Sequence, residues 1–430
     1  MPPLRVLISG ASVAGPTLAY WLVRAGCKVT VVERAPSLRR AGQGLDVRDT
    51  ARDVVKRMGI FDRMLEKSSH EAGIDVVDKN NRPFAHFVAD QSSGKGDSFS
   101  CDIEILRGDL AQILVDVTKD DVSYIFGDMV QSLDETEKDV NVNFANGTPT
   151  TAFDLVIAAD GLGSKIRAMT FDKEDSQIKS LNSYVSYFAV QSNETDSSYA
   201  KCHWIKGGRF MVMRPDNLGR RLAFLGITCY DNADKRLAQL AAASKQGIQA
   251  QKGLVQDLFK DADWELSRIM KGLQDSDENE FYLQHIAQVK LKHWSKGRVG
   301  MVGDAAYAPS PFTGMGTSLS FIGAYLLAGE ISKRPDNVPA ALESYEKVLR
   351  PYVEGIQHLP PGVPYIFVPQ STLGVKVFET CAWAAGKLYE TRIAVWFGKA
   401  IEYFQHGEEQ FKLPDYEAFK PSEKMLQQAG

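Results

Sequence analysis

The stretch LRVLISGASVAGPTLAYWLVRAGCKVTVVER, residues 4–34, decides the fold. Its first six residues are mostly apolar and β-branched, which predicts a buried parallel strand over Leu4–Ser9. A glycine-containing turn follows at once, and then an apolar helical pattern runs from Leu18 to Ala25. The pattern of Cys27–Val32 predicts a second strand, which ends at Glu33. This strand–turn–helix–strand order is the context that a dinucleotide-binding fingerprint requires.

The turn Gly10-Ala11-Ser12-Val13-Ala14-Gly15 departs from the G-x-G-x-x-G fingerprint where Ser12 replaces the middle glycine. We expect Gly10 to make the tight turn and Gly15 to let the helix pack closely on the strand. Ser12 is small enough for the backbone to approach a phosphate, and we count Ala14 with it among the cofactor-binding residues. The helix N-terminus would then offer free N–H groups to a pyrophosphate.

Glu33 lies about 20 residues past the glycines, where a carboxylate binds the hydroxyls of an adenosine ribose. The same charge would repel a 2′-phosphate, so the site favours FAD or NAD over NADP. The alternative interpretation is an ordinary glycine-containing turn between a strand and a helix.

Two more apolar runs end in glycine and aspartate. Phe153–Ala159 predicts a strand closing on Asp160-Gly161, and Arg298–Val302 predicts another closing on Gly303-Asp304. Glycine-rich turns at strand ends bring backbone close to ligands. Taken alone, Asp160-Gly161 is equally typical of a plain turn, and Asp304 of a helix N-cap.

A loop rich in proline and glycine, residues 309–317, follows the third motif and leads into a helical stretch from Leu319 to Ala328. Such a loop presents N–H groups to an anionic atom, which in a flavin enzyme is the N1/C2=O edge of the reduced ring. We expect Asp304 to accept hydrogen bonds from ribityl hydroxyls. The loop residues counted as cofactor-binding are Pro311, Gly314, Met315 and Gly316.

With these three motifs in order, the chain resembles the class A flavoprotein monooxygenases, the FAD aromatic hydroxylases of the para-hydroxybenzoate hydroxylase type. The likeness is greatest to the branch that contains the tetracycline-inactivating monooxygenases, and it covers roughly residues 1–350. It implies an α/β fold, in which a Rossmann-like FAD-binding domain of the GR2 type interleaves with a mostly antiparallel β-sheet substrate domain. A long C-terminal helix that bridges the two domains is also expected.

The resemblance assigns further residues to the cofactor. Glu33-Arg34 is similar to the pair that contacts adenosine, and Arg107 to the arginine that reaches the ribose and ribityl region. Asp160-Gly161 is similar to a motif linked to NADPH as well as FAD. The loop Gly42–Arg48 is similar to the one beside the flavin ring; its cofactor-binding residues are Gly44, Leu45 and Asp46. Arg48 is the one candidate catalytic side chain, and Tyr307 stands where the family often has histidine.

The domains are expected to interleave along the chain. Residues 1–72, 102–172 and 287–350 would form the FAD-binding domain, 73–101 and 173–286 the substrate domain, and 365–430 a C-terminal helical segment. Tyr184–Gln191, Arg209–Met213 and Arg221–Cys229 are predicted strands, and 233–269 is helical in pattern. Residues 375–404 predict one long helix, and 91–100 a flexible loop.

Substrate contacts are predicted on the strands of the second domain. Gln191 stands where the tetracycline-inactivating proteins place a substrate glutamine. The apolar, methionine-containing pattern favours a hydrophobic aromatic or polycyclic substrate. The candidates are Tyr187, Gln191, Met211, Met213 and Phe224, and plain packing within the sheet is the alternative for each.

Composition limits the class of protein. The 430 residues carry a net charge of −4 and no basic stripe, which disfavours nucleic-acid binding. The five cysteines have no CxxC spacing and the seven histidines no ligand spacing, so neither a disulfide framework nor a metal site is predicted. Met1 leads directly toward the first strand, and the apolar stretch 377–396 is interrupted by charges. We therefore expect a cytoplasmic protein without a membrane span, as monomer or homodimer.

The chain has no nucleophilic triad and no P-loop, so the chemistry would be that of the cofactor. The resemblance implies that NADPH, or NADH, reduces FAD and that O₂ forms a C4a-hydroperoxyflavin, which hydroxylates an aromatic or polyketide-like molecule of secondary metabolism. Baeyer–Villiger oxygen insertion on the same scaffold, an oxygen-independent FAD dehydrogenase or reductase, and a non-catalytic flavin-binding protein are the alternatives.

Overall fold

The computed structural model describes residues 2–39, 42–69, 71–88, 104–390 and 411–420. Its N-terminal part is built on a six-stranded sheet in the order β17-β18-β11-β1-β2-β7. Every pairing in this sheet is parallel except that of β17 with β18. The strands are β1 (Arg5–Ser9), β2 (Lys28–Glu33), β7 (Val122–Phe126), β11 (Leu155–Ala158), β17 (Ser295–Lys296) and β18 (Val299–Met301).

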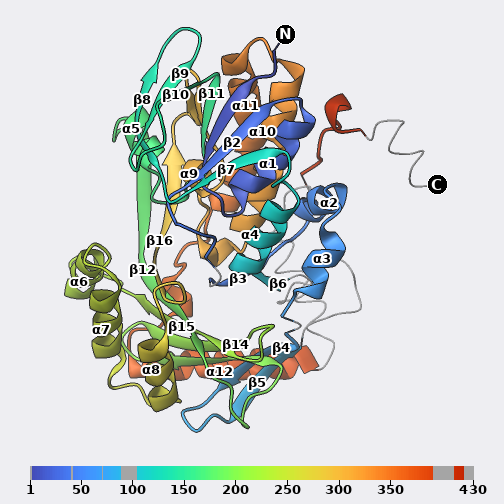
Figure 1. Ribbon diagram of the computed structural model, residues 1–430. Coiled ribbons are helices and arrows are strands. Elements are labelled where there is room, and N and C mark those ends of the chain that lie inside the picture. The colour runs from blue at the N-terminus through green and yellow to red at the C-terminus, as the bar shows by residue number, and fades with distance from the viewer. Residues whose placement is uncertain (1, 40–41, 70, 89–103, 391–410, 421–430) are drawn as a thin grey trace.

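Helices cover this sheet because its central strands are apolar on both faces; Val6, Leu7 and Ile8 are fully buried. Helix α1 packs on α10, and α10 packs on α11 and α2 (Figure 1). A three-stranded antiparallel sheet, β10-β9-β8, contacts β1 through β10. The helices are α1 (Ala14–Arg24), α2 (Thr50–Arg57), α3 (Phe61–Glu66), α4 (Arg107–Asp116), α5 (Lys165–Thr170), α9 (Asp304–Tyr307), η1 (Pro311–Thr313), α10 (Gly316–Lys333), α11 (Val338–Gln357) and η3 (Glu417–Phe419). The strands are β8 (Val130–Glu135), β9 (Val140–Phe144) and β10 (Thr151–Phe153).

The second large sheet has seven strands in the order β16-β12-β15-β14-β13-β4-β5, all antiparallel except for the parallel pair β13–β4. One of its faces packs on α6, α7 and α8 in a separate hydrophobic core. The strands are β4 (Gly73–Val77), β5 (Pro83–Val88), β12 (Ser176–Val190), β13 (Tyr199–Ile205), β14 (Arg209–Pro215), β15 (Arg221–Thr228) and β16 (Tyr282–Leu291). The helices are α6 (Lys235–Ala243), α7 (Ile248–Phe259) and α8 (Leu266–Asp275). Substantial antiparallel sheet beside a Rossmann-like half confirms the predicted fold class.

Two pairs of strands lie where the two large sheets approach each other. Strands β12 and β16 pair from Ser176↔Leu291 to Tyr187↔Tyr282 and run from the upper half of the molecule to the lower half in Figure 1. A separate two-stranded sheet pairs β3 (Gly44–Asp46) with β6 (Glu104–Leu106) between the two large sheets. Among the described residues, the seven-stranded sheet therefore reaches the N-terminal half through packing of β16 on α9, and not by pairing with the six-stranded sheet.

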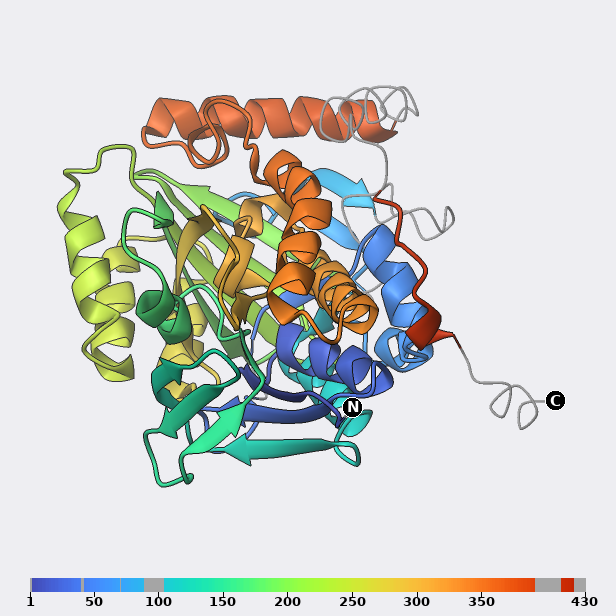
Figure 2. The ribbon, with the colours of Figure 1, turned by 90° about the horizontal axis from the view of Figure 1, so that it is seen from above.

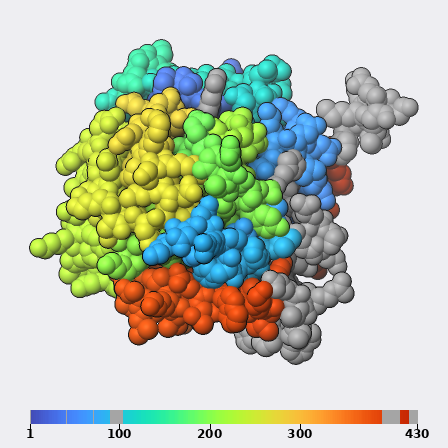
Figure 3. All heavy atoms as spheres, turned by 90° about the horizontal axis from the view of Figure 1, so that it is seen from below, coloured from blue at the N-terminus to red at the C-terminus, as the bar shows by residue number. Residues whose placement is uncertain are grey.

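The C-terminal part of the chain contacts both halves. After η2 (Tyr365–Phe367), helix α12 (Thr372–Glu390) packs on β5 and β13 and lies beside the β4–β5 hairpin at the surface (Figures 2 and 3). The segment 411–420 instead packs into the N-terminal core, where the rings of Tyr416 and Phe419 meet Tyr325. The remainder of the predicted helix, 391–404, and the predicted loop 91–100 lie outside the described residues.

The secondary structure differs from expectation in two places. The predicted strand Phe153–Ala159 is divided, because Phe153 ends β10 in the three-stranded sheet while Leu155 begins β11 in the six-stranded sheet. The helical pattern of 233–269 forms α6, α7 and the start of α8, separated by turns at 244–247 and 260–265. Gly247 has a positive φ of 91°, which accounts for the first of these interruptions.

Candidate active site

The turn after β1 requires glycine at both predicted positions. Gly10 has φ +112°, and a Cβ added there would lie 2.5 Å from the carbonyl oxygen of Ala159. A Cβ on Gly15 would lie 1.9 Å from the carbonyl oxygen of Gly10. The first turn of α1 is therefore pressed against the end of β1, and its N–H groups lie at the carboxyl edge of the sheet, where ligands bind in open α/β sheets.

Glu33, at the end of β2, braces this turn. Its Oε2 accepts a hydrogen bond from Ala11 N–H at 2.9 Å, and its Oε1 accepts one from Ala35 N–H at 3.0 Å. Each carboxylate oxygen retains a lone pair for a further donor. The neighbouring Arg34 is exposed.

The first and third motifs are in contact. Gly303 has φ +63°, and a Cβ there would lie 2.9 Å from Ala14 Cβ. The Arg107 Nε–H group, at the start of α4, donates to Ser12 Oγ at 2.9 Å. Residues almost 300 positions apart in the sequence thus surround the N-terminus of α1.

Asp304 is the acid at the centre of this arrangement. It begins α9 but does not cap it, because the N-cap is Gly303 and no side-chain cap bond forms. Its side chain is accessible to solvent, yet burial raises its pKa while Arg107 opposes the rise. A ligand could therefore reach this carboxylate although protein surrounds it. It makes no hydrogen bond to another side chain or backbone group within the described ranges, and a Cβ on Gly316 would lie 3.7 Å from its Oδ1.

The second motif joins the same region through Arg167. This buried arginine of α5 donates to the carbonyl of Leu162 at 2.5 Å and to that of Ala305 at 2.9 Å. Asp160 Oδ2 accepts from Lys165 N–H at 3.0 Å, whereas its Oδ1 is buried with no hydrogen-bond partner among the described residues. Burial raises the pKa of Asp160. Gly161, beside it, has φ +81°.

The 309–317 loop faces β3 and Arg48. Gly314 has φ +65°, and a Cβ there would lie 4.0 Å from Arg48 Cζ. Arg48 Nη2 donates to Asp46 Oδ2 at 2.7 Å, and its backbone N–H donates to Ser318 Oγ at 3.0 Å. Pro311 begins η1, and Met315 is the N-cap of α10. The structure therefore brings Gly44, Leu45 and Asp46 of β3 to the same side as this loop.

The seven-stranded sheet turns an aromatic face toward the 309–317 loop. Tyr187 and Phe224 are opposite each other in the β12–β15 register, with ring centroids 4.8 Å apart, and Tyr187 stacks on Tyr282 at 6.3 Å. Phe312, from the loop, packs in the same cluster. We call Tyr187, Phe224, Tyr282 and Phe312 the aromatic cluster.

Three predicted substrate contacts lie elsewhere. Met211 and Met213 are 0% and 1% exposed in the core shared with α6, α7 and α8, on the opposite face of the sheet from Phe224. Side chains along a strand alternate between the two faces of the sheet. The sequence alone does not show which of these faces lies toward the 309–317 loop. Gln191 is exposed just beyond β12, where its carbonyl accepts from Arg268. We therefore leave these three residues out of the proposed site.

Sequence reasoning missed Gln284. It is opposite Val185 in the β12–β16 register, so it shares the face of Tyr282 and the aromatic cluster. Its Oε1 is buried and has no hydrogen-bond partner in the described part of the chain. A buried amide without a partner is uncommon, and only the register, which a single sequence does not give, could have placed it here.

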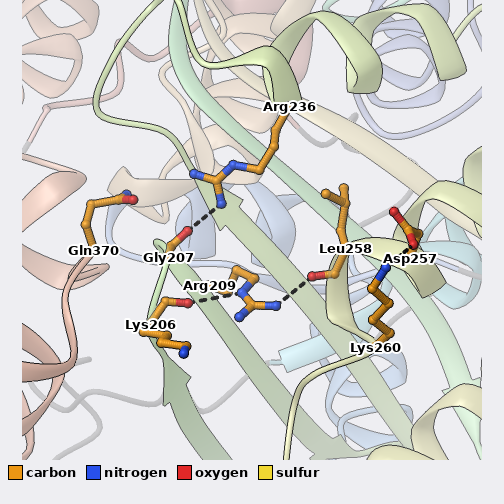
Figure 4. A pocket seen from close by; sticks show the side chains of 8 residues that line it. All are labelled: Lys206, Gly207, Arg209, Arg236, Asp257, Leu258, Lys260 and Gln370. Carbon is orange, nitrogen blue, oxygen red and sulfur yellow. Dashed lines mark hydrogen bonds and ion pairs between the residues drawn. The ribbon is translucent and has the colours of Figure 1, made fainter.

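Another hollow, of about 430 Å³, lies outside this arrangement, between the β13–β14 turn and α7 (Figure 4). Three of its cations are already paired: Arg209 with Asp261, Arg236 with Asp234, and Lys260 with Asp257. These pairs leave little net charge for an anion, so the hollow adds nothing to the site.

The comparisons with known proteins now decide the family. A family described as "FAD binding domain" matches residues 3–358. The chain belongs to this family. Several relatives are named FAD-dependent monooxygenases, and the protein is accordingly a flavoprotein enzyme with FAD as its cofactor. The predicted resemblance is confirmed.

Two curated relatives match over most of their length. Monooxygenase CTB7 of Cercospora beticola is 35% identical over 387 residues, 87% of this chain and 90% of the relative. FAD-dependent monooxygenase asL6 of Sarocladium schorii is 34% identical over 433 residues, 96% and 98% of the two chains.

Solved structures of other proteins have the same fold as this chain. The crystal structure of tetracycline destructase Tet(51) aligns with a TM-score of 0.76 at 31% identity, covering 97% of this chain and all of that one. Klebsiella pneumoniae HpxO in complex with FAD and uric acid, at 19% identity and a TM-score of 0.63, shares the fold.

None of the described helices is both long and apolar enough to cross a bilayer.

The residues present fit FAD. The region at the N-terminus of α1 has the tight glycine packing that lets backbone approach a ligand. It contains an accessible carboxylate, Asp304, with no hydrogen bond to a described residue. The buried acceptors Gln43 Oε1 and Asp160 Oδ1 have no partner within the described ranges. Hydroxyl and N–H donors of a bound dinucleotide would satisfy such acceptors.

Proposed function

We propose that the enzyme uses NAD(P)H and O₂ to hydroxylate an aromatic or polyketide-like small molecule. The observation that carries this proposal is the aromatic cluster, which lines the sheet face opposite the 309–317 loop and includes that loop's own Phe312. Aromatic side chains in offset and edge contacts bind flat rings well. Tetracycline destructase Tet(51), named for a polycyclic compound, supports a substrate of this kind.

We assign the cofactor contacts as follows. The N–H groups of the first turn of α1, around Gly15, would hold the pyrophosphate. The free lone pairs of Glu33 would accept from the adenosine ribose, with Arg34 nearby. Asp304 and Arg107 would bind the ribityl and phosphate region, and the N–H groups of Gly314, Met315 and Gly316 would support the negative edge of the ring.

FAD, when bound, would supply the redox chemistry that couples oxidation of NAD(P)H and reduction of O₂ to the insertion of one oxygen atom into the substrate, with the other leaving as water. The protein positions the substrate on the aromatic cluster, excludes water from the cleft and keeps the positive charge of Arg48 beside the 309–317 loop. The sequence has one dinucleotide fingerprint, so we expect NAD(P)H to bind transiently near the flavin. The cytoplasmic location and the monomeric or homodimeric state stay predictions.

Baeyer–Villiger oxygen insertion is the second candidate, since the same cleft and cofactor serve it. The names of the relatives favour oxygen insertion of either kind over an oxygen-independent dehydrogenase. Both insertions add one oxygen atom, so the structure of the product separates them.

The decisive test follows NADPH oxidation and O₂ uptake together in the purified yellow protein, with a panel of phenolic and polycyclic compounds. We expect a compound that stimulates both rates in equal measure and yields a product one oxygen heavier. NADPH oxidation that continues unchanged without O₂ would contradict the proposal and support the dehydrogenase.

Gln284 provides a test of the substrate face. A substrate hydroxyl or N–H that reaches its Oε1 would be lost to Gln284→Leu, which we expect to raise KM about tenfold or more, the cost of one buried hydrogen bond. The matched control is Gln191→Leu, on the exposed end of the same sheet, which should leave KM unchanged. Equal effects of the two variants would remove Gln284 from the site.

A further inference from the structure

A buried cluster of charged groups lies where the two-stranded sheet meets the seven-stranded sheet. Arg214, on β14, donates through Nε to Glu71 Oε2 at 2.8 Å and through Nη2 to Glu71 Oε1 at 3.0 Å. Its Nη2 also donates to Glu104 Oε2, on β6. Glu71 and Glu104 are 6% and 5% exposed. One guanidinium thus faces two buried carboxyl groups, and it cannot neutralise both.

Glu104 also contacts the strand that leads to Arg48. In the β3–β6 register Glu104 is opposite Asp46, and its Oε1 lies 2.3 Å from where a Cβ on Gly44 would be. Its carboxyl group therefore rests directly on β3. Asp46 in turn holds Arg48, whose guanidinium lies beside Gly314. A continuous series of contacts runs from the substrate-facing sheet to the 309–317 loop.

We propose that Glu104 is a positioning residue for the flavin: its contacts with Arg214 and β3 set where Arg48 stands beside the 309–317 loop. The inference rests on FAD binding alone, so it holds or fails independently of the proposed hydroxylation.

Protonation of Glu104 is what makes this role measurable. Burial raises the pKa of Glu104 to about 8; Arg214 and Arg48 oppose the rise, and Glu71 and Asp46 add to it. These four charged groups supply the electrostatic contributions to that shift. With its pKa raised in this way, the Glu104 carboxyl favours the protonated form at neutral pH. Above about pH 8 it becomes an anion opposite Asp46, and like charges directly opposite across a strand pair repel.

Loss of that proton should therefore displace β3 and, with it, Asp46 and Arg48. The positive charge beside the 309–317 loop would then be less well placed, and the anionic cofactor would bind more weakly. The change is expected in FAD affinity itself, measured without substrate, NAD(P)H or oxygen.

The experiment measures the FAD dissociation constant by flavin fluorescence from about pH 6.5 to about pH 9.5, one and a half units on either side of the expected midpoint. In the wild type we expect constant affinity up to about pH 7.5 and then a loss of about fivefold, the upper range for one cross-strand charge pair. Glu104→Gln, which keeps the shape and cannot ionise, should give a flat profile. Glu71→Gln is the matched control, because Glu71 contacts the same arginine but not β3. It should retain the step but move it to lower pH, since the charge of Glu71 no longer raises the pKa of Glu104.

A flat wild-type profile overturns the proposal without any variant. A loss of affinity that persists in Glu104→Gln also overturns it. The same holds if Glu71→Gln abolishes the loss as completely as Glu104→Gln does, since the two glutamates would then be equivalent and neither would act through β3. Asp46→Asn removes the carboxylate that faces Glu104 and should reduce the step, which supplies a second measurement if Glu104→Gln fails to fold.

Discussion

Replacement of Gly15 by alanine should separate α1 from the turn that precedes it. The new Cβ would lie 1.9 Å from the carbonyl oxygen of Gly10, more than 1 Å inside van der Waals contact. Gly10 cannot retreat, because its N–H is held by the Val32 carbonyl at 2.8 Å and its Cα faces the Ala159 carbonyl. Helix α1 must therefore move outward, at the ~1–3 kcal/mol that overpacking costs.

That movement would take the first N–H groups of α1 away from the proposed pyrophosphate site. Loss of one hydrogen bond to a charged group, worth about 1.5–3 kcal/mol, weakens FAD binding at least tenfold. The assay is the FAD dissociation constant by fluorescence, together with urea unfolding of the apoprotein.

The matched control is Gly253→Ala in α7, where an added Cβ meets nothing within 4 Å. Alanine in the exposed interior of a helix should raise the unfolding free energy by about 1 kcal/mol and leave FAD binding unchanged. If Gly15→Ala binds FAD as tightly as the wild type and unfolds at the same urea concentration, α1 is not displaced by the added Cβ.

Three further outcomes are expected. Asp304→Asn should weaken FAD binding about tenfold, the difference between charged and neutral hydrogen bonds, whereas Asp336→Asn on the surface should not; equal affinities would contradict the role of Asp304. Arg167→Lys should lower the unfolding free energy by about 1–3 kcal/mol in urea melts, because lysine cannot serve both carbonyls that the fork of Arg167 reaches. Burial alone would raise the pKa of Glu330, but hydrogen bonds from Lys333, Ser344, Arg334 and Tyr416 lower it to about 2; this stabilisation is present above about pH 4.5 and is lost as pH falls toward 2. Glu330→Gln should therefore show a smaller fall in unfolding free energy over that range, and an undiminished fall would exclude this carboxyl as its source.

The local elements of the first half could be read from the sequence because they follow simple periodicities. Leu4–Ser9 and Cys27–Val32 are mostly apolar runs that end at a glycine or an acid, and they form β1 and β2 within a residue or two. The run Phe153–Ala159 was wrongly predicted as one strand, because apolar character does not show where a chain passes from one sheet to another. Asp154 lies at that point, and its Oδ1 forms an ion pair with Arg5 Nη2 at 2.7 Å.

The turns of the candidate site could be predicted from the sequence, because their backbone conformations require glycine. Gly10, Gly15 and Gly303 adopt conformations or approaches that a Cβ would forbid, so their positions carried information. The opposite holds for side chains on the sheet. Met211 and Phe224 are both apolar strand residues, and only the pairing register puts one in the helix-side core and the other in the aromatic cluster. The Glu104–Arg214 contact joins residues 110 positions apart, with no local signal at either.

The long pairing of β12 with β16 bears on how such enzymes can be recombined. The seven-stranded sheet cannot be exchanged as an independent unit, because β16 packs on α9 of the N-terminal half and is paired along its length with β12. The register of this pair is irregular at one place, between Ser180 and Ser183. A chimera that exchanged sheets between relatives should therefore make its crossover there, where the break in pairing already tolerates a change of alignment.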